Sequence, residues 1–198
     1  MRPCHRLLCA ILGVAVIGTA QALAATPVKS TKLPSGMGFN FDAQHDQITA
    51  TGVQLKPSPM ASPSITPTTG TITVTINIKA VSTFRPNTEF HCSLAAIGGL
   101  IDTGNGTVAG GFETANVRAT PNGAGTATCT LTIPYSWSLH ADPSADTGLV
   151  LAFGVSAVRE GRGDSSQNQV IRSTLQVDGI ENLPANGATS MFTFDVAL

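Results

Sequence analysis

The chain has 198 residues, of which 42% are hydrophobic and 12% are charged, and its formal net charge is −1. This length fits one domain, or one domain with a tail, and is enough to bury a core without help from a metal. Lys and Arg are few and scattered, which argues against a nucleic-acid partner because phosphate binding requires clustered basic side chains.

Residues 1–24 are typical of an export signal. A basic start, MRPCHR, precedes the apolar run LLCAILGVAVIG, and the small-x-small site that ends at Ala24 predicts cleavage after that residue. The apolar run is too short to span a bilayer comfortably, and no later segment is suited to do so. The signal therefore predicts a secreted or periplasmic protein with no transmembrane segment in the mature chain. Lipidation fits less well because Cys9 precedes most of the apolar run.

Removal of this signal changes both the charge and the cysteine count. Arg2 and Arg6 are lost but no acidic residue is, so nine basic and twelve acidic residues remain, with a net charge of −3. The remaining cysteines are Cys92 and Cys129, and an even number in an exported protein favours a disulfide. Closing the loop between them would stabilise the fold by about 4 kcal/mol in the chain-entropy description.

Residues 25–69 are expected to form an N-terminal extension. The stretch from 25 to 36 has two prolines and no periodicity, which is typical of an exposed lead-in. Two short strands are expected at Met37–Phe41 and Gln47–Leu55, separated by the polar sequence DAQHD, and Gly52 interrupts the second. Four prolines follow within residues 56–69 and indicate a linker or an edge loop.

The main run of strands begins at Gly70–Ala80, where isoleucine and valine alternate with threonine, asparagine and lysine. Arg85-Pro86-Asn87 predicts a turn into the strand TEFHCSLAA, residues 88–96. The glycine-rich IGGLIDTGNG that follows is expected to be a connection. A weaker strand region is expected from Thr107 to Thr120, with the glycine pair Gly110-Gly111 as a candidate break.

The stretch GTATCTLTI, residues 125–133, predicts a strand that follows the turn signal Pro121-Asn122-Gly123. Its even-numbered positions are all threonine, and its odd-numbered positions from residue 127 onward are apolar, a period of two. Cys129 lies on the apolar face, and Cys92 lies on the apolar face of its own strand. We therefore expect the disulfide to join the inner faces of two strands.

The remaining sequence predicts three more strands. Residues 135–146 look irregular, and Leu149–Val158 is apolar on both faces, which predicts a central strand. Gln169–Val177 follows a polar loop and would form a hairpin with it. Thr189–Leu198 alternates again, with phenylalanine, valine and leucine on one face.

About seven to nine short strands, with turn signals roughly every ten residues, predict an all-β protein. We expect an antiparallel immunoglobulin-like β-sandwich with one disulfide over residues 70–198, and a barrel is the alternative. The likeness to immunoglobulin domains concerns the architecture only, because Trp137 follows the second cysteine instead of lying between the two.

The segment His140–Asp146 is the most metal-like in the sequence. Asp142, Ser144 and Asp146 have the spacing with which a calcium loop begins, and such oxygen ligands suit a hard cation. Thr147 then stands where that loop needs glycine. A solvated turn is therefore favoured.

Other chemistry-bearing residues are sparse. The mature histidines, His45, His91 and His140, are far apart for a local zinc or copper site, and the parity of His91 predicts a surface side chain. No Gly-x-Ser-x-Gly turn occurs, and the spacing of carboxylates gives no support to acid–base chemistry. We therefore expect no enzyme activity, no cofactor and no metal.

Tyr135 and Trp137 provide a binding alternative. In an extended segment both rings would project from one side as a small platform for stacking sugars, as in a carbohydrate-binding module. Their odd numbering continues the inward parity of the Cys129 strand, so core packing is favoured. Arg162-Gly163-Asp164, which integrin ligands also display, is better explained as loop chemistry.

An export signal and one disulfide are features in which this chain resembles chaperone-assembled fimbrial subunits, and its last strand alternates as a donated strand does. This resemblance implies exchange of a strand between protomers, whereas closure of its own sandwich is the simpler fate of the strand. The chain differs from them in the late position of Cys92 and in Ala197 as the penultimate residue. We expect a non-enzymatic structural or binding module with a polysaccharide or surface protein as partner. A carbohydrate-binding module and a fibre subunit are the alternatives.

Overall fold

The structure is a computed structural model that describes residues 37–52, 54–55, 68–79, 84–85, 87–102, 107–123, 125–137, 147–159, 169–180 and 185–198. In these ranges the chain forms eleven strands and no helix. The strands are β1 (Gly38–Asp42), β2 (Gln47–Thr51), β3 (Gln54–Leu55), β4 (Thr68–Lys79), β5 (Thr88–Asp102), β6 (Thr107–Arg118), β7 (Thr120–Gly123), β8 (Thr126–Trp137), β9 (Thr147–Arg159), β10 (Gln169–Ile180) and β11 (Thr189–Ala197). The expected export signal, the calcium-like turn and the Arg162-Gly163-Asp164 loop lie outside the described residues.

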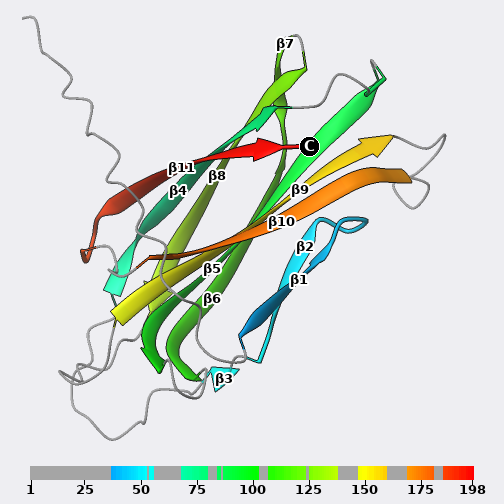
Figure 1. Ribbon diagram of the computed structural model, residues 1–198. Coiled ribbons are helices and arrows are strands. Elements are labelled where there is room, and N and C mark those ends of the chain that lie inside the picture. The colour runs from blue at the N-terminus through cyan, green and yellow to red at the C-terminus, as the bar shows by residue number, and fades with distance from the viewer. Residues whose placement is uncertain are drawn as a thin grey trace, which may run out of the picture.

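The strands form two sheets and a separate hairpin (Figure 1). One sheet has the order β11-β4-β8-β7, the other has the order β10-β9-β5-β6-β3, and β1 pairs with β2. The main apolar core draws on both sheets, while the hairpin packs on the outer face of the five-stranded sheet. The predicted all-β, sandwich-like fold is confirmed.

Two details of the predicted architecture differ from the structure. β11 runs parallel to β4, and β3 runs parallel to β6, so the sheets are not wholly antiparallel. The structure also has more strands than expected, because the two-residue β3 and the four-residue β7 are too short to produce a periodic pattern. The immunoglobulin-like architecture stays a prediction.

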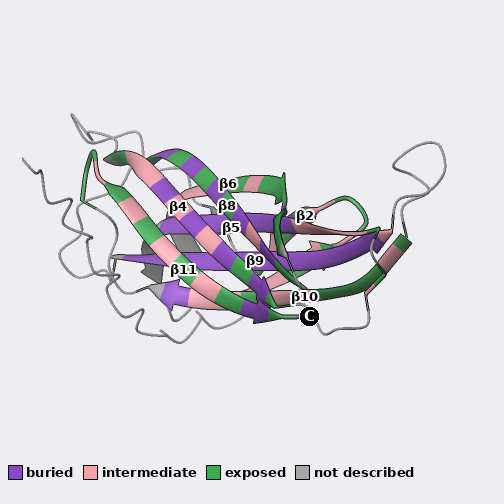
Figure 2. Cartoon of the chain, turned by 90° about the horizontal axis from the view of Figure 1, so that it is seen from above, coloured by how far each residue is buried: buried purple, intermediate pink, exposed green. Residues whose placement is uncertain are grey.

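The period of two in β4 and β8 corresponds to one buried and one exposed face. The two strands pair antiparallel along their whole length, with Thr73 opposite Thr132 and Val74 opposite Leu131. Apolar side chains point into the core and threonines point outward, which gives the alternating bands of Figure 2. The predicted orientation of both strands is confirmed.

The predicted disulfide is present. Cys92 of β5 and Cys129 of β8 are bonded, with their Cα atoms 6.3 Å apart, and both are buried. β5 and β8 belong to different sheets, so the bridge crosses the core. It closes the predicted loop of 37 residues.

The central strands β5 and β9 are buried on both faces (Figure 2). In β9, Leu151 and Phe153 face the main core, whereas Val150 and Ala152 face the β1–β2 hairpin. A strand covered on both sides carries no polar face, which explains its nearly continuous apolar sequence. The prediction that this strand is central is confirmed.

Two strands continue through glycines at which the sequence predicted a connection or a break. β5 continues through Gly98 to Asp102, and β6 is unbroken across Gly111. These two glycines are opposite each other in the pair, and a Cβ atom on either would collide with the Trp137 indole. The glycines therefore provide room for a large side chain from the other sheet. The break in this part of the chain lies instead at Ala119, between β6 and β7.

The N-terminal hairpin contributes a third layer. Its apolar side chains, among them Met37 and Ile48, pack against Ala95 and Ala152 of the central strands or their neighbours. Gly154 in β9 allows close approach, because a Cβ atom there would meet the Phe41 ring. The polar sequence DAQHD forms the hairpin turn.

Candidate functional site: the Asp46 clamp and the adjoining groove

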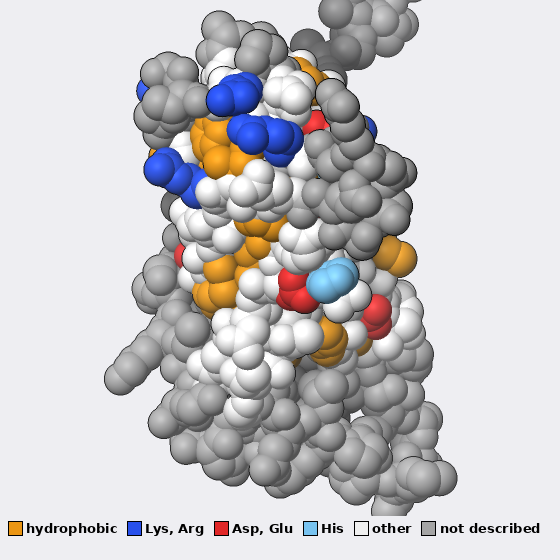
Figure 3. Space-filling model, turned by 90° about the vertical axis from the view of Figure 1, so that its right-hand side faces the viewer, with side chains coloured by type: hydrophobic (Ala, Val, Ile, Leu, Met, Phe, Trp, Pro, Cys, Tyr) orange, Lys and Arg blue, Asp and Glu red, His pale blue; other side chains and the backbone are white. Residues whose placement is uncertain are grey.

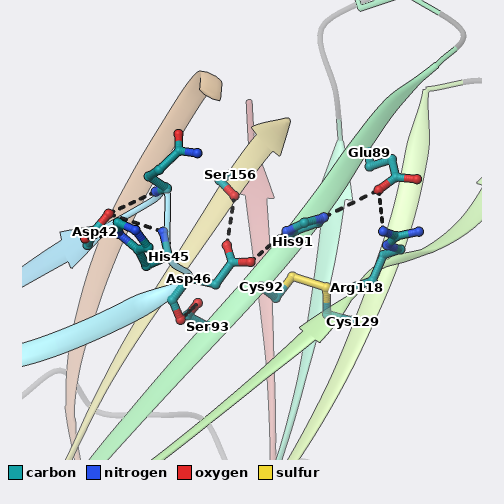
Figure 4. A network of polar contacts seen from close by, with 11 residues as sticks. Asp42, His45, Asp46, Glu89, His91, Cys92, Ser93, Arg118, Cys129 and Ser156 are labelled. Atoms are coloured by element: carbon teal, nitrogen blue, oxygen red, sulfur yellow. Dashed lines mark hydrogen bonds and ion pairs between the residues drawn. A yellow bond between two sulfur atoms is a disulfide. The ribbon is translucent and has the colours of Figure 1, made fainter. Parts of the chain in front are cut away.

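The end of the hairpin turn is fixed to the five-stranded sheet by Asp46 (Figure 4). One carboxylate oxygen lies 2.7 Å from His91 Nδ1, and the other accepts a 3.4 Å hydrogen bond from Ser156 Oγ. The Asp46 carbonyl oxygen accepts a 2.8 Å bond from Ser93 Oγ. We call these four residues the Asp46 clamp.

The strand register explains how the clamp is assembled. His91 of β5 is directly opposite Ser156 of β9, and Ser93 lies two residues further along β5 on the same face. Both serines are buried. A buried hydroxyl needs a hydrogen-bond partner, and the turn supplies one for each. Asp46 reaches them from a backbone with a positive φ of 53°, a conformation that aspartate tolerates better than most residues.

An ion-pair chain continues from His91 toward β6. His91 Nε2 lies 3.6 Å from Glu89 Oε2, and Arg118 Nη2 lies 2.9 Å from the same oxygen. The hydrogen bond with Asp46 is the largest cause that raises the pKa of His91, and Glu89 adds to it. Burial and the Arg118 charge act in the opposite direction. The imidazolium form is thus held between two carboxylates.

This arrangement predicts a stability that depends on pH. Because the folded protein raises the His91 pKa above its ordinary value of 6.5, the contribution of His91 is complete below that pH and is lost as pH rises through the folded-state pKa. We expect the free energy of urea unfolding of the wild type to fall as pH rises through this range. The free energy of unfolding of His91→Gln should not show this fall. His45→Gln, which alters only the exposed pair with Asp42, is the control and should keep the loss. An unchanged pH profile in His91→Gln would contradict the assignment.

The clamp does not have the geometry of a serine nucleophile. A Ser-His-Asp relay places the imidazole between the hydroxyl and the carboxylate. Here the carboxylate of Asp46 lies between Ser156 and His91, and the second imidazole nitrogen is directed to Glu89. The arrangement fits a structural role, in which a polar turn is attached to a buried strand pair.

A groove of about 390 Å³ adjoins the clamp. It separates the hairpin strand β2 from β6, and Asp46 and Ser93 contribute to it. The groove is also lined by the polar residues Gln47, Thr49, Thr114 and Asn116 and by the apolar residue Phe112. Within the described strands, β2 pairs with β1 alone, so the backbone edge that faces this groove has no strand beside it. The volume is within the range of ligand sites.

The predicted aromatic platform lies in the core. Tyr135 and Trp137 are 4% and 2% exposed, and their rings stack on each other with centroids 4.3 Å apart. Trp137 also fills the space over Gly98 and Gly111. Neither ring presents a face to a sugar. The core packing that the parity of these two residues favoured is confirmed, and the alternative of a sugar-stacking platform is not formed.

The predicted surface position of His91 also needs correction. The outward parity of the side chain is as expected, but the hairpin turn covers it, and only 15% of the side chain is exposed. His45 is exposed beside Asp42, and His140 lies outside the described residues. Among the residues with described positions, no three His, Cys, Asp or Glu side chains are grouped to hold a metal ion.

Charged side chains are separated on the side of the molecule seen in Figure 3. Basic side chains gather at one end, and a histidine lies beside acidic side chains nearer the middle.

Over the ranges that the structure covers, no helix has the length and apolar character needed to cross a membrane.

Sequence reasoning missed Asp46, Glu89, Arg118 and the two clamp serines. One signal was present, because Ser156 is a polar residue within the apolar strand LVLAFGVSAV. A hydroxyl on a buried face requires a polar cover. The identity of that cover, a turn more than one hundred residues earlier, could not be read from the pattern.

The fold and these contacts define an all-β, sandwich-like protein with one disulfide that crosses its core. No protein-family model matches the chain, and searches of curated proteins and of solved structures also give no match.

Proposed function

We propose that the chain is an exported, non-enzymatic β-sandwich protein of immunoglobulin-like architecture that acts as a binding module at the cell surface, in the periplasm or outside the cell. The groove between β2 and β6 is the observation that carries this proposal. It combines an edge of β2 with which no described strand pairs and threonine and asparagine side chains on the opposite wall. An extended segment of a surface protein suits both features, because main-chain hydrogen bonds give affinity and side-chain pockets give selectivity.

The clamp supports this role by holding one wall of the groove in place. Asp46 belongs both to the clamp and to the groove lining, and its contacts with His91 and Ser93 fix the start of β2 on the sheet. A wall that is already positioned loses little conformational entropy when a ligand binds.

The proposal can be tested with extended peptides selected from a random phage-displayed library on the folded protein. Thr114→Arg would fill the groove, and we expect the affinity of the selected peptides to fall about tenfold or more. Thr132→Arg is the matched control on the exposed face of the other sheet and should leave the affinity unchanged. Selected peptides that bind both variants equally, or no enrichment of peptides, would refute the groove as a binding surface.

A fibre subunit is the second candidate, and the position of β11 favours it. This strand lies at one end of the four-stranded sheet, where it contacts β4 on one side. Polymerisation through such a strand would produce multimers that grow with protein concentration. No observation on the described residues favours carbohydrate binding over these two candidates.

A further inference from the structure

Among the described residues, no strand pairs with the outer edge of β11. Ala188 O accepts from Thr71 N, and Leu198 N donates to Lys79 O, so even-numbered residues of this segment direct their backbone groups toward β4. In an extended strand, alternate residues direct these groups to opposite sides. The N–H and C=O groups of Met191, Thr193 and the other odd-numbered residues therefore point away from the sheet.

The other edges of the two large sheets have features that discourage pairing, whereas β11 has none of them. β10 has a bulge between Val170 and Arg172, β7 is four residues long and contains Pro121, and β3 has two residues. β11 spans nine residues with no proline, no lysine and no shift in its register with β4. Natural proteins rarely leave a long regular edge without such protection.

The side chains that accompany this edge are compatible with a second strand. Met191 is 68% exposed, more than any other large hydrophobic side chain in the described residues. Thr189 and Thr193 flank it on the same face. The one charged residue of β11, Asp195, accepts a 3.0 Å hydrogen bond from Asn77 of the neighbouring strand.

We propose that β11 pairs antiparallel with β11 of a second copy of this chain, about a two-fold axis at Met191, to form a continuous eight-stranded sheet. In this register the two Met191 side chains lie beside each other and cover their exposed surface. Thr189 of each copy is opposite Thr193 of the other, and both have outward backbone groups that can exchange hydrogen bonds. The two Asp195 carboxylates lie toward opposite ends of the ladder, which avoids like-charge contact.

A second β11 fits this edge better than other segments of the chain. The stretches 25–36 and 56–69 contain prolines, which interrupt a ladder of hydrogen bonds. A pair related by a two-fold axis is closed, so the inferred assembly is a dimer and not a growing fibre. The inference depends on neither the groove nor its ligand.

The test measures the mass of the oxidised full-length mature protein by sedimentation over a wide range of concentrations. We expect a monomer–dimer equilibrium. Met191→Lys places two ammonium groups at the axis, and Thr193→Pro removes an outward N–H without removing a bond to β4. Each variant should weaken dimerisation about tenfold or more. Thr132→Lys, on the same sheet face but on β8, is the matched control and should dimerise as the wild type does.

Three results would overturn the proposal. The first is a wild-type monomer at every concentration, and the second is a dimer that both β11 variants leave intact. The third is an assembly that grows beyond two copies, which would favour the fibre subunit instead. If Thr193→Pro fails to fold, as judged by circular dichroism, Met191→Lys alone decides, because its exposed side chain can change without loss of packing.

Discussion

Replacement of Trp137 with alanine should lower the free energy of unfolding by about 3–5 kcal/mol. The indole is almost completely buried and stacks on Tyr135. It occupies space that two facing glycines, Gly98 and Gly111, leave open between the strands. Alanine would leave a cavity there that backbone atoms cannot easily fill. Denaturant unfolding followed by far-ultraviolet circular dichroism measures the change without relying on the lost tryptophan fluorescence.

A double-mutant cycle identifies the source of this loss. Gly98→Ala alone should cost about 1–3 kcal/mol because its methyl group enters the Trp137 ring. Combined with Trp137→Ala, the same methyl group enters free space. The double variant should therefore lose less unfolding free energy than the sum of the two single variants. Tyr135→Phe is the control for aromatic stacking and should be nearly neutral, since the tyrosine hydroxyl is buried without a hydrogen bond in the described part of the chain. Additive costs would contradict the proposed packing.

Loss of the disulfide should be as severe. The bridge between Cys92 and Cys129 closes a loop of 37 residues, for which the chain-entropy description gives about 4 kcal/mol. We expect Cys129→Ser to lower the free energy of urea unfolding by several kcal/mol. The fold should persist, because the sheets also bury a large apolar core between them.

Reduced wild-type protein separates the bridge from the side chains that form it. It keeps both sulfur atoms in the core but lacks the covalent bond, so it should lose most of the stability that Cys129→Ser loses. A smaller additional loss is expected for the variant, because its serine hydroxyl is buried on an apolar face. Equal stability of oxidised and reduced wild type would show that the bridge contributes little.

Local patterns were sufficient to predict the strands that are half buried. Cys129 and Leu131 alternate with threonines because one face of β8 is buried and the other is exposed to solvent. The alternation of apolar and polar residues in the sequence therefore predicts both the strand and its orientation. The same argument placed Trp137 on the inner side. Leu149–Val158 was recognisable as central because a strand covered on both faces has no polar side.

Features that depend on contacts between distant segments could not be predicted in this way. Gly98 was assigned to a connection because glycine usually weakens a strand, and its use as space for Trp137 depends on the opposite sheet. His91 was correctly directed outward, but its cover comes from the hairpin turn at Asp46. Nor does a period of two specify strand order, so the parallel pairing of β4 with β11 was missed.

The position of β4 in its sheet has a consequence for folding. Its neighbours β8 and β11 are far away in the sequence, as shown by contacts from Thr73 to Thr132 and from Asn77 to Asp195, which span 59 and 118 residues. Neither pairing can begin as a local hairpin, and closing such long loops costs chain entropy before any contact is gained. High contact order slows folding and prolongs the time during which strand edges are exposed. The order in which these partners reach β4 therefore governs how long its apolar face is available for aggregation.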